Sequence, residues 1–248
     1  MPEARRRTLA VTTALLTVLG AAAPAVAATA PSLVQAPLAA HHGGGTLHST
    51  SGNWSGYAAT GGRFTSVKAS WVQPAVSCTG TDTWSSFWVG LDGDGSNSVE
   101  QTGTEADCSG GSPVYSSWYE MYPAYPVDFS NTVRPGDHFT ASVTTNGSGS
   151  FTLTLADTTA GWSRTVNKSL KSAALASAEV IAEAPSSATG VLPLSNFHSV
   201  AFSGASVNGQ SLGGFNPDAI TMASGGVTKA TTSGLSGGSA FSVSWKHS

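Results

Sequence analysis

Charged residues are scarce in this chain. Lys, Arg, Asp and Glu make up only 10% of its 248 residues, against about 25% in an average soluble protein. The 11 basic residues are outnumbered by 14 acidic ones, and no stripe of Lys and Arg is present to neutralise a row of phosphates. The composition therefore excludes a basic nucleic-acid-binding protein, and the same scarcity excludes a coiled coil, which needs charged flanking positions.

The chain also lacks the composition of a helical bundle. It contains 29 Gly and 12 Pro, so turns are frequent, and frequent turns favour many short strands. Its hydrophobic fraction of 40% is enough to build one sizeable core over this length. Beyond the first 27 residues, no stretch reaches the roughly 18 apolar residues that a membrane span needs. We expect no membrane association.

Residues 1–27 have the features of a secretory signal peptide. Arg5–Arg7 form a positively charged start, an apolar stretch follows from Leu9 to about Ala23, and an A-x-A cleavage site ends at Ala27. The next segment, 28–51, is rich in Ala, Pro and Gly and has no hydrophobic period, so we interpret it as a propeptide or linker. We therefore expect a secreted, extracellular protein.

Only two cysteines are present, Cys78 and Cys108. In an exported chain an even number of cysteines usually indicates a disulfide. Closing the loop between them would stabilise the fold by roughly 3–4 kcal/mol. We therefore expect a Cys78–Cys108 disulfide.

The remaining residues, 52–248, form one domain in which apolar and polar residues alternate. Phe87, Val89 and Leu91 alternate with polar or small residues and with Trp88. The same period of two occurs in residues 114–122, 139–143, 151–155 and 241–245. This period, with turn residues between the runs, predicts antiparallel strands and an all-β sandwich or barrel.

One Ala-rich segment, 169–184, disagrees with this pattern. Its helix propensity alone predicts a helix. Glu179 and Glu183 lie four residues apart and would share a face in a helix and in a strand alike. Pro185 ends the element in either case.

Common hydrolase signatures are absent. The sequence has no H-E-x-x-H and neither Asp-Thr-Gly nor Asp-Ser-Gly, so a zinc peptidase or a pepsin-like aspartate pair is not indicated. Residues 234–238 fit G-x-S-x-G around Ser236, but no strand-to-helix context surrounds them, so we interpret the match as coincidence. His138 and His198 could assist a serine nucleophile, yet no serine partner is indicated.

Carboxylates, amides and aromatic residues share faces on three predicted strands. They are Trp88 and Asp92 on the first, Val99, Gln101 and Gly103 on the second, and Trp118, Glu120 and Tyr122 on the third. Such a set could form the floor of a groove for an extended polymer. The alternative is that the Trp residues belong to the core and the acids are solvated. The pattern by itself favours this second interpretation, because short patterns arise often.

Five short strings, taken in their order and spacing, carry a more specific signal. They are Asn53-Trp54-Ser55-Gly56, Trp88-Val89-Gly90-Leu91-Asp92-Gly93, Val99-Glu100-Gln101-Thr102-Gly103, Trp118-Tyr119-Glu120-Met121-Tyr122-Pro123 and Ala178-Glu179-Val180-Ile181-Ala182-Glu183. From about Asn53 to about Phe202 the chain resembles the glutamic peptidases, the eqolisins or peptidase family G1. It departs from the best-known fungal members at Glu105, Met121 and Ala184-Pro185, so we identify it as a bacterial-type member.

The resemblance implies a sandwich of two large antiparallel sheets with a lectin-like, jelly-roll shape. It also implies that Ser177–Glu183 is extended despite its Ala content. Gln101 and Glu183, not Glu179, match the catalytic dyad. The positions that match the substrate-binding residues of the family are Trp88, Asp92, Trp118, Glu120 and Tyr122.

The implied activity is acid-acting endopeptidase cleavage of protein or peptide substrates by a monomer. Glu183 would act as general base on water, and Gln101 would donate an N–H to the oxyanion. Neither a metal nor another cofactor is required. Two alternatives remain open: a carbohydrate-binding β-sandwich that uses its aromatic residues for stacking, and a glycosidase that uses Glu120 and Glu183.

Overall fold

The computed structural model describes residues 48–248. The expected signal peptide and most of the expected propeptide lie outside the described residues. Within the described part, none of the helices is long and apolar enough to cross a membrane, and the helical structure is one short 3-10 turn, η1 (Leu212–Phe215). The strands are β1 (His48–Ser51), β2 (Trp54–Ala59), β3 (Ser66–Val72), β4 (Ser86–Leu91), β5 (Val99–Ser109), β6 (Ser112–Tyr122), β7 (Val127–Asp128), β8 (His138–Thr145), β9 (Ser150–Asp157), β10 (Trp162–Ser169), β11 (Ala178–Glu183), β12 (Ser186–Ser187), β13 (Gly190–Val191), β14 (Ser199–Val207), β15 (Gln210–Ser211), β16 (Asp218–Ser224), β17 (Val227–Thr232) and β18 (Phe241–Trp245).

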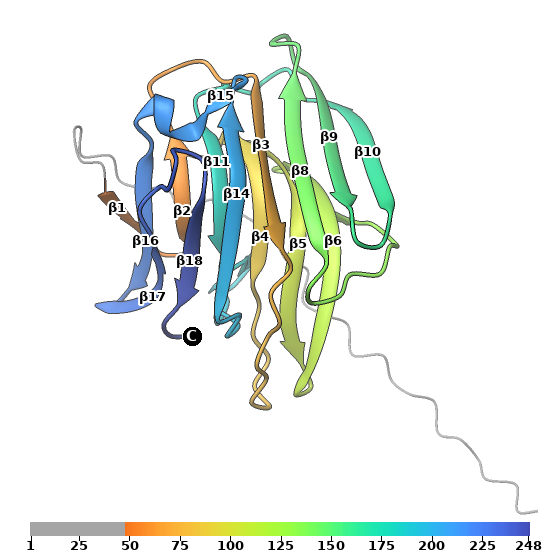
Figure 1. Cartoon of the computed structure of the whole chain (residues 1–248), viewed down its shortest axis with the longest axis vertical. Coiled ribbons are helices and arrows are strands. Elements are labelled where there is room, and N and C mark those ends of the chain that lie inside the picture. The colour runs from red at the N-terminus through yellow and green to blue at the C-terminus, as the bar shows by residue number, and fades with distance from the viewer. Residues whose placement is uncertain (1–47) are drawn as a thin grey trace, which may run out of the picture. The chain divides into compact units, whose positions relative to one another are not determined.

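Apart from β12 and β13, which form a separate two-stranded sheet, these strands form two packed layers. Hydrogen bonding runs through one ladder in the order β10-β9-β8-β3-β14-β18-β17-β16-β2-β11-β4-β5-β6-β7. The ladder folds over, so that β4 and β5 pack against β3, β8 and β9 of the other layer (Figure 1). Almost all pairings are antiparallel. The expected all-β sandwich is confirmed.

The main core lies between the layers and follows the alternation in the sequence. Phe87, Val89 and Leu91 of β4 are fully buried there, against residues such as Phe139 and Leu153 of the facing layer. The opposite face of the same strands carries a second apolar cluster. Its members are Trp54, Ala58, Trp88, Val99, Trp118, Ile181 and Ile220, with Tyr122 packed at its edge. We call this the outer cluster.

The Ala-rich segment forms a central strand. β11 pairs with β2 on one side and β4 on the other, so its backbone groups are bonded on both edges and helix propensity is overridden. Small residues suit this crowded place: a Cβ on Gly56 of β2 would lie 2.2 Å from the carbonyl oxygen of Val180. The expectation that the segment up to Glu183 is extended is confirmed for Ala178–Glu183.

The described domain begins before residue 52, the start expected from the sequence. β1 pairs in parallel with β16, with Ser51 opposite Met222. Ser51 is 3% exposed. Four residues of the expected propeptide, 48–51, are therefore part of the sheet.

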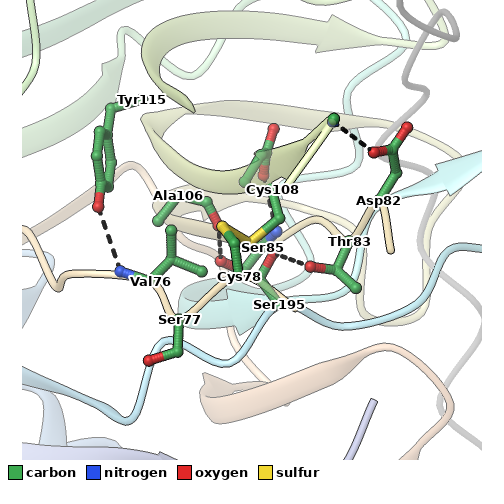
Figure 2. Close-up of a disulfide and its surroundings, with 12 residues drawn as sticks. Val76, Ser77, Cys78, Asp82, Thr83, Ser85, Ala106, Cys108, Tyr115 and Ser195 are labelled. Atoms are coloured by element: carbon green, nitrogen blue, oxygen red, sulfur yellow. Dashed lines mark hydrogen bonds between the residues drawn. A yellow bond between two sulfur atoms is a disulfide. The ribbon is translucent and has the colours of Figure 1, made fainter. Parts of the chain in front are cut away.

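The Cys78–Cys108 disulfide is present. It joins the loop between β3 and β4 to the end of β5, with the two Cα atoms 5.5 Å apart. Figure 2 shows the hydrogen bonds around it, in which Ser85 Oγ donates to the Ala106 carbonyl and Ser195 Oγ donates to Thr83 Oγ1. The bridge therefore fastens the loop that leads into β4, the strand that carries Trp88.

Removing this bridge by the double substitution of Cys78 and Cys108 to Ser is expected to lower the free energy of unfolding by roughly 3–4 kcal/mol, because the unfolded chain regains loop entropy. Chemical denaturation of both proteins measures the difference. Alkylation without reductant, followed by intact-mass measurement, is the control on the purified protein. Two alkylated thiols there would contradict the disulfide.

Candidate active site

The residues that resemble a catalytic site lie on the outer face of β11, β4, β5 and β6. Strand pairing puts Gln101 opposite Glu120, and Trp88 opposite both Gly103 and Ile181. Because side chains on neighbouring strands at paired positions share a face, these side chains lie on the same face as the outer cluster. They lie on the face away from the main core.

Glu183, the last residue of β11, is held by two donors. Asn53 Nδ2 donates to Glu183 Oε1 at 3.1 Å, and Trp88 Nε1 donates to Glu183 Oε2 at 2.8 Å. The carboxyl group is 1% exposed. Each oxygen therefore has one fixed donor, which sets the direction of its remaining lone pairs.

The pKa of Glu183 reflects opposing effects. Burial raises it well above the ordinary value of 4.5, and the neighbouring carboxyl of Glu120 adds to the rise. The hydrogen bonds from Trp88 and Asn53, together with the nearby indole N–H of Trp54, act in the other direction, because they stabilise the ionised form. The net result is a raised pKa, so this carboxyl group takes up a proton at a higher pH than an exposed Glu.

Gln101 donates a hydrogen bond to Glu120, the carboxyl group that also acts on Glu183. Its Nε2 donates to Glu120 Oε2 at 2.6 Å, and its side chain is 1% exposed. An amide nitrogen has two hydrogens, so one N–H remains for another acceptor. The Oε1 atom accepts no hydrogen bond from the described residues. The amide thus keeps one donor and one acceptor for a ligand.

The structure separates Glu183 from Glu179, although the two share a strand face. Strand register places Gln101 opposite Gly90, and Gly90 opposite Glu179. The carboxyl of Glu179 nevertheless interacts with Ser177, Asp94 and Asp92 rather than with Glu120. Side-chain interactions therefore group Glu183 with Glu120 and Gln101, and they place Glu179 in a different cluster of acids.

Asp92 has a different environment from the other residues of the predicted substrate site. It follows the last residue of β4 with a positive φ of 66°, and both of its oxygens accept hydrogen bonds. Oδ2 accepts from the Leu175 N–H at 2.9 Å and Oδ1 from the Ala176 N–H at 2.7 Å. Asp92 therefore fixes the loop that leads into β11, the strand that ends with Glu183.

The remaining predicted substrate-binding residues line the outer cluster. Trp88, Trp118 and Glu120 are 0–1% exposed, while Tyr122 is half-buried. The Trp118 indole N–H donates to none of the described residues. A hollow of about 280 Å³ lies elsewhere, over β8, β9 and β10, and none of the predicted site residues lines it.

Two glycines keep the site compact. A Cβ on Gly103, the glycine of the Q-T-G string, would lie 2.2 Å from the carbonyl oxygen of Phe87. A Cβ on Gly90 would lie 2.9 Å from the indole ring of Trp88. Both positions therefore need glycine, because a side chain there would collide with the backbone of β4 or with the Trp88 ring, whose Nε1 donates to Glu183.

Asn53 is a site residue that the sequence reasoning missed. It was part of a recognised string, but nothing in the local sequence indicated that its side chain reaches β11. Its sequence distance from Glu183 is 130 residues. Only the pairing of β2 with β11 brings the two together.

Other candidates lie outside this group. Ser236 is in the tight turn between β17 and β18, with no helix after it. His198 Nε2 lies 2.8 Å from Ser77 Oγ at an exposed position, in the region of the disulfide. Among residues 48–248, no three His, Cys, Asp or Glu side chains are arranged to hold a metal ion.

A β-sandwich with a buried amide and two buried carboxyl groups on one outer face carries the acid–base and hydrogen-bond-donor groups that a hydrolase can use. Similarity to known proteins identifies the family. The model of the peptidase A4 family, the G1 glutamic peptidases or eqolisins, matches residues 52–245. The chain belongs to this family, so the expected resemblance is confirmed.

Solved structures of the family superpose on most of the chain. Scytalido-glutamic peptidase with a peptide-based transition-state analogue has a TM-score of 0.69 and 27% identity, over 79% of this chain and 98% of that one. SCP-B, an eqolisin in complex with the tripeptide Ala-Ile-His, has a TM-score of 0.66 and 26% identity over the same shares. Aspergilloglutamic peptidase from Aspergillus niger has a TM-score of 0.61 and 29% identity, over 66% of this chain and 99% of that one.

A curated relative is also similar in sequence. Aspergillopepsin-2 of Aspergillus niger is 31% identical over 143 residues, which are 49% of this chain and 51% of that protein. The matched part therefore spans about half the length of the curated relative.

Proposed function

We propose that this protein is a secreted, monomeric endopeptidase that hydrolyses peptide bonds in protein or peptide substrates under acid conditions. Glu183 is the general base and Gln101 the oxyanion donor. The observation that carries this proposal is the interaction of both residues with Glu120, on one face of the sheet. The relatives with a bound transition-state analogue and a bound tripeptide support a peptide substrate.

Glu183 activates the water. Its two oxygens each receive one donor, from Asn53 and Trp88, so a free lone pair can accept a hydrogen bond from a water molecule. As the water oxygen forms a bond to the scissile carbonyl carbon, its proton moves to the Glu183 carboxylate. The neighbouring Trp rings keep bulk water away from this transfer.

Gln101 stabilises the charge that this attack creates. The carbonyl oxygen becomes an oxyanion, and the second N–H of Gln101 Nε2 donates to it. The first N–H remains on Glu120 Oε2, which holds the amide in place before the reaction begins. Fixed donors of this kind act without reorganisation.

Collapse of the tetrahedral intermediate completes the reaction. The C–N bond breaks, and the proton that Glu183 took from water passes to the leaving amine. The products are a carboxylic acid and an amine, and the water supplies all added atoms. Glu183 is then ionised again, ready for the next turnover.

The pH dependence follows from the environment of Glu183. The base must be ionised, and burial raises its pKa well above 4.5. The acid limb of kcat/KM is therefore expected at a higher pH than the ordinary pKa of an exposed Glu would give. Hydrolysis rates of a fluorescence-quenched peptide, measured from pH 3 to pH 7, locate this acid limb.

The function is tested by incubating the purified protein with denatured casein and, in parallel, with polysaccharides over that pH range. Cleavage of casein alone supports the proposal. Cleavage of polysaccharide would support a glycosidase using Glu120 and Glu183, and binding without cleavage would support a carbohydrate-binding module. Chelators and serine-directed reagents are expected to leave casein cleavage unchanged.

Gln101→Ala is expected to lower kcat by about 100- to 1,000-fold with a much smaller change in KM, since one oxyanion donor is lost. Gln101→Glu places a new carboxyl group beside Glu120, which raises the pKa of one of them, so residual activity should persist only at low pH. Steady-state kinetics measure both variants. Gln210→Ala, which removes an exposed amide, is the control. A wild-type kcat in Gln101→Ala would contradict the oxyanion role.

A further inference from the structure

The segment that follows the N-terminal strand β1 contacts the candidate catalytic carboxyl group through Asn53. We propose that Ser51 and Asn53 are positioning residues, with Ser51 orienting the Asn53 amide and Asn53 holding the Glu183 carboxyl group in its reactive direction. This inference rests on the proposed role of Glu183 as general base. It gives a role to Ser51, which lies in the segment 28–51 interpreted from the sequence as a propeptide or linker.

Asn53 contacts the end of β11 at two places. Its Nδ2 donates to Glu183 Oε1 at 3.1 Å, and its carbonyl oxygen accepts from the Ala184 N–H at 2.8 Å. The residue is 0% exposed. Asn53 therefore holds both the Glu183 side chain and the backbone of the next residue, and the carboxyl group cannot rotate without breaking a buried hydrogen bond.

Ser51 determines which way the Asn53 amide faces. Its hydroxyl donates to Asn53 Oδ1 at 3.2 Å and accepts from the N–H groups of Asn53 and Trp54, at 3.3 and 3.1 Å. An amide group has an acceptor end and a donor end. Because Ser51 engages the acceptor end, the donor end faces Glu183.

β1 anchors this arrangement in the sheet. Its parallel pairing with β16 runs from His48 opposite Ala219 to Ser51 opposite Met222, and Met222 is fully buried. The Ser51 hydroxyl is thus delivered by a paired strand. The active form should therefore begin at or before His48, with any maturation cleavage within 28–47.

The hydrogen bond from Asn53 can be measured through its effect on the pKa of Glu183. The groups that act on this carboxyl are Glu120 from β6, which raises its pKa, and the donors Trp88 and Asn53 with the nearby Trp54 indole, which lower it. Loss of the Asn53 amide removes one donor to the ionised form. The pKa of Glu183 should then rise further, and the acid limb of kcat/KM should move to higher pH.

The test compares pH–rate profiles of Asn53→Ala, Ser51→Ala and Ser51→Thr. Asn53→Ala should move the acid limb upward by about one pH unit and lower kcat with little change in KM. Ser51→Ala, which removes only a hydroxyl group, should act in the same direction to a smaller extent. Ser51→Thr keeps the hydroxyl group and should restore the wild-type profile.

Thr50→Ala is the matched control, because Thr50 precedes Ser51 on β1 and is exposed. It should behave like the wild type. Near-ultraviolet circular dichroism of the Trp residues reports whether each variant is folded. N-terminal sequencing of active enzyme that begins at Gly52 with full activity would overturn the inference.

The outcomes separate this inference from the proposed function. If Glu183→Gln abolishes hydrolysis while folded Ser51→Ala and Asn53→Ala keep the wild-type kcat and acid limb, the positioning role is wrong and the proposed function stands. If Glu183→Gln retains activity, the proposed function itself fails. Both an upward shift in Asn53→Ala and rescue by Ser51→Thr are required to support the inference.

Discussion

Replacing Glu183 by Gln is expected to abolish peptide hydrolysis while leaving the β-sandwich intact. The amide cannot take a proton from water, so the reaction loses its general base. It is close in size to the carboxyl group, and its single carbonyl oxygen can accept from Asn53 or from Trp88, so one of the two buried hydrogen bonds to this position is kept. Hydrolysis of casein and of a defined peptide, measured with thermal unfolding on the same preparation, tests both statements.

Glu179→Gln is the matched control for this experiment. Glu179 lies on the same strand and the same face and is 0% exposed, but its carboxyl group interacts with Asp92 and Asp94. Its activity should be close to that of the wild type. Ser236→Ala should also be silent. Activity in Glu183→Gln, or loss of activity in Ser236→Ala, would refute the proposed mechanism.

Raising the pH from 4.5 towards 8 is expected to destabilise the folded protein by several kcal/mol. Glu100 is 0% exposed, and burial together with the nearby charge of Asp92 raises its pKa from 4.5 to about 8. Between these two values the unfolded chain is ionised at this position and the folded chain is not, so stability falls as the pH rises. The shift corresponds to about 4–5 kcal/mol.

Other buried acids act in the same direction. Burial raises the pKa of Glu179 and of Asp107 well above their ordinary values. Their contribution to stability is likewise fully present below the ordinary pKa and is lost as the pH rises. The protein should therefore be most stable in the acid range in which the proposed peptidase works.

Denaturant unfolding at pH 4.5 and at pH 8 measures this effect. Glu100→Gln, which cannot ionise, should reduce the pH dependence, because the burial cost of the charged form is gone. Asp82→Asn is the control, since Asp82 is exposed and its replacement should leave the pH dependence unchanged. Equal pH dependence in Glu100→Gln and the wild type would contradict the assignment to this residue.

The sequence determined the features of this protein that depend on local pattern. The period of two along β4, β8 and β9 predicted which side chains enter the main core, because alternate residues of a strand point to opposite faces. Cysteine number and the leader predicted the disulfide. The strings around Gln101 and Glu183 carried the family and its candidate dyad.

The tertiary structure alone decided how these local features combine. β11 is a strand because two neighbours bond to its edges, although its Ala content favours a helix. Asp92 binds the backbone of a loop, and Asn53 meets Glu183 across 130 residues. The folding-over of the ladder also gives the outer face its own cluster of Trp side chains. These contacts join residues far apart in sequence, and no local period records which strands will pair or which donors a buried carboxyl group will find.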